Sequence, residues 1–430
     1  MKTKARLALA LLALALSSCS PRGDSPVVLH FWAMGREGEV ARALLPEFEK
    51  AHPDIRVEIQ QSPWTAAQQK LLTAFAGDVT PDLCQLGNTW VPQFAALGAL
   101  APLDARVAAS PAVPQADYFA GIWDSNRIGD TVYGVPWYVD TRLLFYRSDL
   151  LAAAGFKAPP QTWAEWQRML AALKRRSGPD KFGVLLPTNE FEPLLVLALQ
   201  QQDELLRDGG RYGNFRSAAF RTTLAYYLDM FRMQWAPSVS NTQISNVWDE
   251  FGRGYFTFYV TGPWNIGEFK RRLPAGLQNS WTTAPMPGPN SPGVSMAGGS
   301  SLVVFKASRH QQEAWQLIEF LSRPDVQRRF YDLTGNLPAR RSAWQGSELT
   351  KDPRSVAFRQ QLELTRSPPK VPEWDRIATE MKLVAEALIA GQYTLDQAVT
   401  ELDVRADRIL EKRRWMLDHA ARQTAVKGQP

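Results

Sequence analysis

Strand-like and helix-like patterns alternate along the first part of this chain. Short apolar segments of strand length fall at 27–31, 55–59 and 82–86, and segments with a helical apolar repeat separate them at 39–50 and 65–75. Helices that connect successive strands place those strands side by side and parallel. The alternation therefore predicts an α/β fold with mainly parallel sheets flanked by helices.

The alternation continues in the middle of the chain. The sequence predicts strands at 133–135 and 143–146, followed by a helix at 148–154. Thr162 with Glu165 three residues later is a capping-box pattern, which indicates that a further helix begins there. Strand and helix signals thus extend well beyond the first sheet.

The length of the chain exceeds what one core supports. At 430 residues the protein is larger than the size at which a single hydrophobic core stops growing, so at least two lobes are expected. The stretch 285–299 is rich in Pro, Gly and Ser and predicts a chain crossover between lobes. Another strand follows at 301–305, and residues 354–414 are predicted to form several helices.

The N-terminal segment has the pattern of an export signal. A basic start precedes an apolar stretch from Leu7 to Leu16, and two serines then lead into Cys19. This cysteine resembles the lipid-attachment site of bacterial lipoproteins. We expect residues 1–18 to be a lipoprotein signal peptide and 19–26 a tether with lipidated Cys19; an ordinary secretory signal with an incidental cysteine is the alternative. The protein is then periplasmic or extracytoplasmic and anchored to the membrane.

Charge and composition narrow the possible partners. The whole chain carries a net charge of +6, but residues 1–18 contain three basic and no acidic residues, so the remainder is close to neutral. No block of Lys and Arg with interleaved aromatic residues occurs, which argues against a nucleic-acid partner.

The cysteines and histidines give no metal or redox pattern. Cys84 is the only cysteine besides Cys19 and has no partner for a disulfide if Cys19 is lipidated. The four histidines are far apart and lack the spacing of a metal site. We therefore expect neither a metal nor a cofactor.

Aromatic residues next to polar residues are the strongest local functional signal. Trp90, Trp137 with Tyr138, and Trp264 with Asn265 lie in segments predicted to be loops. A flat aromatic face beside hydrogen-bonding groups suits a sugar ring, which has an apolar C–H face and a rim of hydroxyls. For any single tryptophan, packing in the core is at least as good an interpretation.

Several segments, in their order and spacing, resemble one protein family. They are Leu29-His30-Phe31-Trp32, Pro81-Asp82-Leu83, Gly87-Asn88-Thr89-Trp90, the stretch 133–141, Leu144-Phe145-Tyr146, Gly262-Pro263-Trp264, the stretch 297–301 and the stretch 335–340. With them the chain resembles the extracytoplasmic carbohydrate-binding proteins of ABC importers, the solute-binding group that includes maltose- and trehalose-binding members.

The resemblance implies a two-lobed periplasmic-binding-protein fold of type II, hinged by three chain crossings. Lobe 1 would comprise 27–138 plus 299–338, and lobe 2 would comprise 139–298 plus 339–414. Residues 415–430 would form a C-terminal tail. Ligand would lie in the cleft between the lobes.

The resemblance also implies which residues bind the ligand. Arg340 would be a bidentate donor, and Gly298 and Gly299 would let the backbone approach the ligand closely. The full set is Arg36, Glu37, Trp64, Gln85, Asn88, Trp90, Trp137, Tyr138, Asp140, Trp248, Trp264, Asn265, Gly298, Gly299 and Arg340.

These expectations define a function. A monomeric lipoprotein would capture a neutral di- or oligosaccharide, with trehalose or maltose as the leading choices, close over it, and deliver it to the membrane permease subunits of an ABC importer. It would not be an enzyme. Two alternatives stay open: a secreted glycoside hydrolase, which also needs aromatic platforms and paired carboxylates, and the same fold binding a non-carbohydrate solute.

Overall fold

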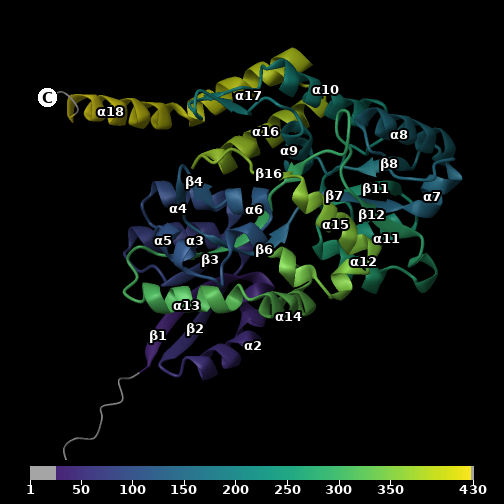
Figure 1. Cartoon of the computed structure of the whole chain (residues 1–430). Coiled ribbons are helices and arrows are strands. Elements are labelled where there is room, and N and C mark those ends of the chain that lie inside the picture. The colour runs from purple at the N-terminus through teal and green to yellow at the C-terminus, as the bar shows by residue number, and fades with distance from the viewer. Residues whose placement is uncertain (1–25, 428–430) are drawn as a thin grey trace, which may run out of the picture.

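The computed structural model describes residues 26–427, which form two α/β lobes side by side (Figure 1). The expected signal peptide, Cys19 and the tether up to residue 25 lie outside the described residues, as do residues 428–430. No helix within 26–427 is long and apolar enough to cross a membrane.

The first lobe is built on a six-stranded sheet with the order β15-β6-β14-β3-β1-β2. The strands are β1 (Val27–Met34), β2 (Ile55–Ser62), β3 (Leu83–Gly87), β6 (Val135–Asp140), β14 (Gly298–Val304) and β15 (Leu337–Pro338). Its larger helices are α2 (Gly35–Ala51), α3 (Trp64–Ala76), α13 (Gln311–Leu321) and α14 (Pro324–Thr334). Strand β14, from the last third of the chain, thus lies between strands from the first third.

The second lobe has a four-stranded sheet with the order β12-β7-β11-β8. The strands are β7 (Leu143–Arg147), β8 (Phe182–Leu185), β11 (Phe256–Thr261) and β12 (Trp281–Ala284), and the helices around them include α8 (Trp163–Ser177), α9 (Glu192–Leu199), α10 (Ala218–Arg232), α11 (Val247–Gly252), α12 (Trp264–Arg272) and α15 (Pro353–Glu363). Helix α8 begins with the capping box of Thr162 and Glu165, so that prediction is confirmed.

Both sheets are mixed, which corrects the expectation of mainly parallel sheets. Strand β1 is parallel to β2 and β3, but β14 is antiparallel to β3 and β6. In the second sheet β7 is antiparallel to β11 and β12, and only β11 and β8 are parallel. Parallel neighbouring strands need a crossover connection between them, usually a helix. Strand β14 enters the first sheet from the other lobe, so no such connection fixes its direction relative to β3 and β6. The α/β class itself is as predicted.

Short elements join the lobes and complete the chain. Beside the crossings, β13 (Ser295–Met296) pairs in parallel with β16 (Thr365–Arg366). Other short helices and strands are α4 (Val91–Ala96), α5 (Asp104–Ala109), α6 (Ala120–Asp124), β4 (Arg127–Ile128), β5 (Thr131–Val132), α7 (Ser148–Ala153), β9 (Leu206–Arg207) and β10 (Tyr212–Gly213), with short 3₁₀ turns at 88–90, 115–117, 241–243, 275–277, 341–344 and 348–350.

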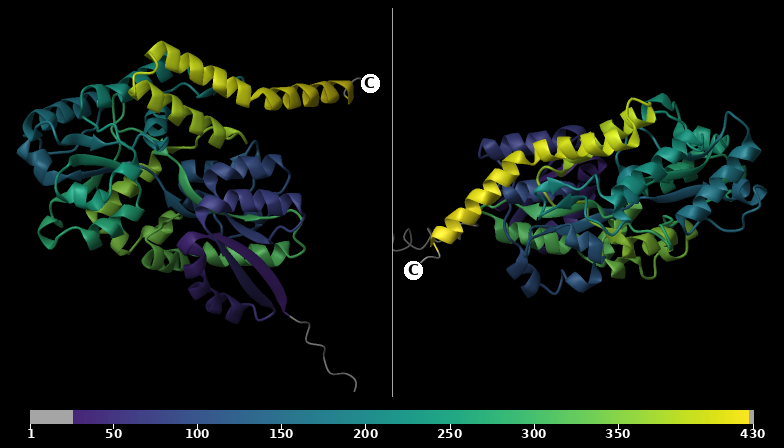
Figure 2. Two further views of the ribbon diagram at one scale, coloured as in Figure 1. Left: turned by 180° about the vertical axis from the view of Figure 1, so that it is seen from behind. Right: turned by 90° about the horizontal axis from the view of Figure 1, so that it is seen from above.

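Three helices end the chain: α16 (Trp374–Ile389), α17 (Leu395–Ile409) and α18 (Glu411–Lys427). Helices α16 and α17 pack on each other and on α10 of the second lobe. Helix α18 extends away from the lobes in all views (Figure 2). The segment expected as a C-terminal tail from 415 onward is therefore helical as far as 427.

Candidate functional site

The turn after β1 brings an acidic residue against the first-lobe aromatic residues. Gly35 has φ of 53°, and a Cβ there would lie 2.9 Å from Glu37 Oε2 and 3.0 Å from the Trp64 ring. Only a residue without a side chain allows this turn at low cost. Asn336 donates a 2.9 Å hydrogen bond to Glu37 Oε1, which ties the start of α2 to the loop before β15.

Two indoles form an aromatic surface beside this turn. The rings of Trp64 and Trp90 lie 5.5 Å apart with a 60° angle between their planes, and both side chains are half-buried. A Cβ on Gly87 would lie 3.4 Å from Trp90 and 3.7 Å from Trp64, so the glycine leaves room for both rings. Arg36 is exposed on the first turn of α2.

The end of β6 carries the polar groups at the first chain crossing. Burial raises the pKa of Tyr138 well above its usual value, and the carboxylates of Glu37 and Asp140 raise it further. Burial likewise raises the pKa of Asp140; Arg142 opposes this, whereas Glu192 and Glu37 add to it. The pKa of Asp140 therefore depends on charges from both lobes, because Glu37 lies in the first turn of α2 and Glu192 lies in α9.

Arg142 connects this strand end to the second lobe. Its Nη1 lies 3.2 Å from Asp140 Oδ1 and its Nη2 lies 3.2 Å from Glu192 Oε1. The guanidinium carbon lies 4.6 Å from the centre of the Trp264 ring, the arrangement of a cation–π contact. Trp264 is 43% exposed at the start of α12. One face of its ring is thus held by the protein while much of the ring stays accessible.

Trp248 and Asn265 support one another within the second lobe. Trp248 Nε1 donates a 2.9 Å hydrogen bond to Asn265 Oδ1, and Asn265 Nδ2 donates a 2.8 Å bond to Thr261 Oγ1. Arg272 lies over the Trp248 ring at 4.2 Å. Asn265 is buried, so in this arrangement it orients Trp248 and does not present a free amide.

Two of the expected ligand residues are instead held inside the first lobe. Gln85 accepts a 2.8 Å hydrogen bond from the Met34 amide and donates to Tyr138 Oη at 3.2 Å. Asn88 donates to the Gly298 carbonyl at 3.2 Å and accepts from Ser301 Oγ at 2.9 Å. Both side chains are buried and act on the site through the strands that they join.

The prediction of loops is wrong for Trp137 and Tyr138, which lie in β6, and for Trp264 and Asn265, which begin α12. Trp137 belongs to β6, is 1% exposed, and stacks on Phe330 with ring centres 4.4 Å apart. Pro136, the second residue of β6, hides the strand signal in the sequence. The packing of Trp137 against Phe330 of α14 depends on contacts far apart in sequence. Trp137 is therefore a core residue.

Gly298 and Gly299 lie where β14 meets the end of β6. A Cβ on Gly298 would lie 2.2 Å from Asp140 Oδ1, and one on Gly299 would lie 2.4 Å from the Tyr138 carbonyl oxygen. Gly299 also has a φ angle of 113°, a backbone conformation that residues other than glycine rarely adopt. These glycines allow the close approach of the two strands that places Asp140.

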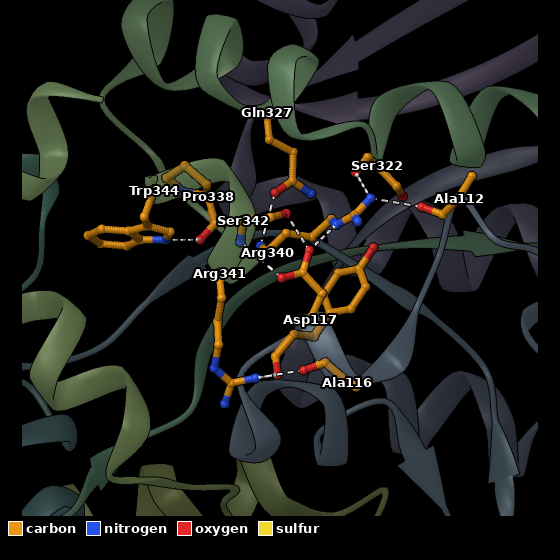
Figure 3. A network of polar contacts seen from close by, with 11 residues as sticks. Ala112, Ala116, Asp117, Ser322, Gln327, Pro338, Arg340, Arg341, Ser342 and Trp344 are labelled. Carbon is orange, nitrogen blue, oxygen red and sulfur yellow. Dashed lines mark hydrogen bonds and ion pairs between the residues drawn. The ribbon is translucent and has the colours of Figure 1, made fainter. Parts of the chain in front are cut away.

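Arg340 is buried and belongs to a polar network with Asp117, Ala112 and Ser322 (Figure 3). Its Nε lies 2.7 Å from Asp117 Oδ2, and its Nη1 donates to the carbonyls of Ala112 at 2.9 Å and Ser322 at 3.0 Å. Burial alone would raise the pKa of Asp117, but hydrogen bonds from Ser342 and Arg340 outweigh it and hold that pKa below its usual value.

The role expected for Arg340 is therefore corrected. Because its guanidinium is engaged by one carboxylate and two carbonyl groups, it fixes the third chain crossing to the first lobe. It offers no bidentate face to a ligand in this arrangement.

The structure adds residues that the sequence did not single out. Arg142 contacts Asp140, Asn336 contacts Glu37, and Glu192 contacts Arg142. Burial and the charge of Glu192 raise the pKa of Glu190. Asn336 lies within the stretch 335–340, which carries the family resemblance, and Arg142 directly follows the stretch 133–141, so these segments could have suggested both residues. Glu192 has no local signal, because it is 50 residues from Arg142 in sequence.

Among residues 26–427, no group of three or more His, Cys, Asp or Glu side chains is arranged to hold a metal ion. The arrangement offers hydrogen-bonding carboxylates, a guanidinium and accessible indole faces at the junction of two lobes. Such a site suits binding of a polar, uncharged ligand with apolar faces.

Comparison with known proteins establishes the family. Residues 34–328 match the sequence profile of the bacterial extracellular solute-binding proteins. The structure of the sugar-binding protein MalE from the phytopathogen Xanthomonas citri matches with 55% identity and a TM-score of 0.89, covering 91% of this chain and 99% of that one. The chain belongs to the bacterial extracellular solute-binding protein family.

Two further relatives cover most of the chain. A protein of Brucella abortus (strain 2308), described as a binding protein, is 25% identical over 419 residues, which is 96% of this chain and 99% of the relative. The diacetylchitobiose-binding protein DasA of Streptomyces coelicolor is 23% identical over 363 residues, 83% of each chain. The family resemblance and the two-lobed type II fold predicted from the sequence are thereby confirmed.

Proposed function

We propose that this protein captures a neutral di- or oligosaccharide between its two lobes, with maltose or trehalose as the leading candidates. The observation that carries the proposal is the 55% identity to a sugar-binding protein over 99% of that protein's length. The geometry supports it, because Trp64, Trp90 and Trp264 offer indole faces and Glu37 and Asp140 offer acceptors for sugar hydroxyls.

The proposed mode of binding uses stacking and hydrogen bonds alone. Carboxylates that accept hydrogen bonds from sugar hydroxyls reject analogues without those hydroxyls, because a buried acceptor then loses its partner. Glu37 in the first lobe and the pair of Asp140 and Arg142 at the crossing supply these groups, and Trp264 supplies a face from the second lobe. Closure of the lobes would then exclude water from the ligand.

The proposed cellular role follows from the family. The protein would be exported, attached to the membrane through a lipid on Cys19, and would act as a monomer that delivers its sugar to the permease subunits of an ABC importer. Replacement of Cys19 by Ser tests the anchor: the variant should leave the membrane fraction and lose incorporation of labelled fatty acid. A variant that stays lipidated would overturn this assignment.

The test of ligand class is calorimetric titration and thermal unfolding with maltose, trehalose, sucrose, glucose and galactose. Because ligand binds the folded form, a sugar at 100 times its Kd should stabilise the protein by about 2.7 kcal/mol. A shift with a charged solute but with none of the sugars would contradict the proposal. Sustained release of monosaccharide would indicate a glycoside hydrolase instead.

A further inference from the structure

Arg142 occupies the first crossing between the two sheets and is fixed there from several sides. Its guanidinium contacts Asp140 of β6 and Glu192 of α9, so it links the two lobes. Its carbonyl accepts a 2.7 Å hydrogen bond from Ser295 of the neighbouring crossing. The side chain is 14% exposed, which leaves it in reach of a ligand but with a restricted set of rotamers.

The contact with Trp264 depends on the local backbone. A Cβ on Gly262 would lie 2.0 Å from the Trp264 ring, so the ring is placed against a residue that has no side chain. Arg142 lies 4.6 Å from the centre of the same ring. A planar guanidinium stacks on an indole and bonds two carboxylates at once, whereas a lysine ammonium has no flat face to do so.

The charges around Arg142 are unequal. Four carboxylates lie close enough to affect one another. The negative charge of Glu192 raises the pKa of both Asp140 and Glu190, and Glu37 of the first lobe raises the pKa of Asp140 further. Arg142 is the cation that opposes this negative charge at both Asp140 and Glu190. Removal of its charge would leave a cluster of acids next to an accessible indole ring, an environment that attracts a cation.

We infer that Arg142 determines the charge of the sugar that the site accepts: it opposes the negative charge of Asp140 and Glu192, so that an uncharged oligosaccharide is preferred over one carrying a protonated amine. This inference rests on the proposed function, because it concerns the same site. It makes Arg142 a specificity-determining residue as well as the residue that positions Trp264.

The test compares matched ligands on matched variants. Trehalose is paired with 2-amino-2-deoxytrehalose, and maltose with 2-amino-2-deoxymaltose, and calorimetry gives the Kd of each. Wild-type protein should bind the neutral member more tightly by roughly tenfold or more, and Arg142→Gln should reverse the order, since charged hydrogen bonds differ from neutral ones by this amount. Arg142→Lys should keep the neutral preference with weaker binding.

Two controls separate charge from structure. Trp264→Phe should weaken both members of a pair by the same factor, because it reduces the stacking face and leaves the charges in place. Arg221→Gln removes a cation from an ion pair with Asp396 on the surface of the second lobe and should change neither Kd.

Each outcome decides between the two proposals. If Arg142→Gln alters both Kd values by one factor, or neither, Arg142 only supports the structure and the inference is overturned. If the wild type binds no neutral sugar, the proposed function fails, and the inference falls with it. A reversed ratio supports both, and it does so even if the melting temperature of Arg142→Gln falls, because loss of the pairs with Asp140 and Glu192 is expected to destabilise the protein.

Discussion

At the scale of single residues, Arg340 shows how a conspicuous side chain can serve the fold. It joins residues 112–118, the end of α13 and the segment after β15 through Asp117 and two carbonyl groups. Removing one partner of a buried ion pair leaves the other charge without compensation. The residue therefore holds the third crossing in place.

Replacing Arg340 by Ala should accordingly destabilise the protein by about 1–3 kcal/mol, because half-buried Asp117 loses its cationic partner and keeps only the hydrogen bonds from Ser342, and the carbonyls of Ala112 and Ser322 lose their donor. Urea unfolding followed by circular dichroism measures the loss, with the exposed Arg309→Ala as control. The folded fraction should retain its sugar affinity. A stable variant that no longer binds sugar would indicate that Arg340 contacts the ligand.

Asp140 is a second residue where stability and binding are expected to oppose each other. Burial raises its pKa in the folded protein above the unfolded value of about 3.9. The folded state therefore favours the protonated form, and ionisation of Asp140 removes stability as the pH rises from about 4 through the raised pKa. This is the reverse of an aspartate stabilised by a salt bridge.

Asp140→Asn removes this titration, so the melting temperature of the variant should rise relative to wild type between pH 4 and pH 8. Its sugar affinity should fall, because Arg142 loses one partner. Thermal scans at several pH values with calorimetry at pH 7 measure both effects. A melting difference that is constant with pH would contradict the assignment.

At the scale of elements, α18 differs from the helices around it. Arg413 and Arg414 donate to the carbonyls of Gly210 and Arg211, and Arg211 pairs with Asp418, so its described contacts with the body lie in its first half. The later part of the helix extends away from both lobes (Figure 2). Its contribution to the fold should end with these contacts.

Ending the chain after His419 should therefore leave the melting temperature and the sugar affinity unchanged. The comparison is a truncated protein against the full chain, by thermal unfolding and titration. Ending it after Leu410 is the matched control and should lower the melting temperature, because the contacts of Arg413 and Arg414 are lost. Equal destabilisation by both truncations would contradict this division of the helix.

At the scale of the whole molecule, the two sheets are linked by crossings that bring Asp140, Arg142 and Ser295 together. A ligand held by residues of both lobes favours the conformation in which both contact it. We expect saturating sugar to lower the radius of gyration measured by small-angle X-ray scattering. Trp264→Ala should remove the change under the same conditions. An unchanged radius with bound sugar would argue for a rigid site.

Local sequence determined the elements. The apolar spacing of 27–31 and 55–59 marks β1 and β2, and Thr162 with Glu165 marks the start of α8, because these signals depend on residues close along the chain. The ordered series of short segments also identified the family.

Tertiary structure alone decided which of the expected residues are free to contact a ligand. The antiparallel insertion of β14 between β3 and β6 brings Gly298 against Asp140, and no local pattern records a partner more than 150 residues away. Trp137 and Arg340 are residue types that often bind sugars, but segments distant in sequence bury both of them. No sequence motif marks Arg142 as a ligand-binding residue, yet it lies between the two lobes. Residue type sets what a side chain can bind, and packing sets whether it is free to do so.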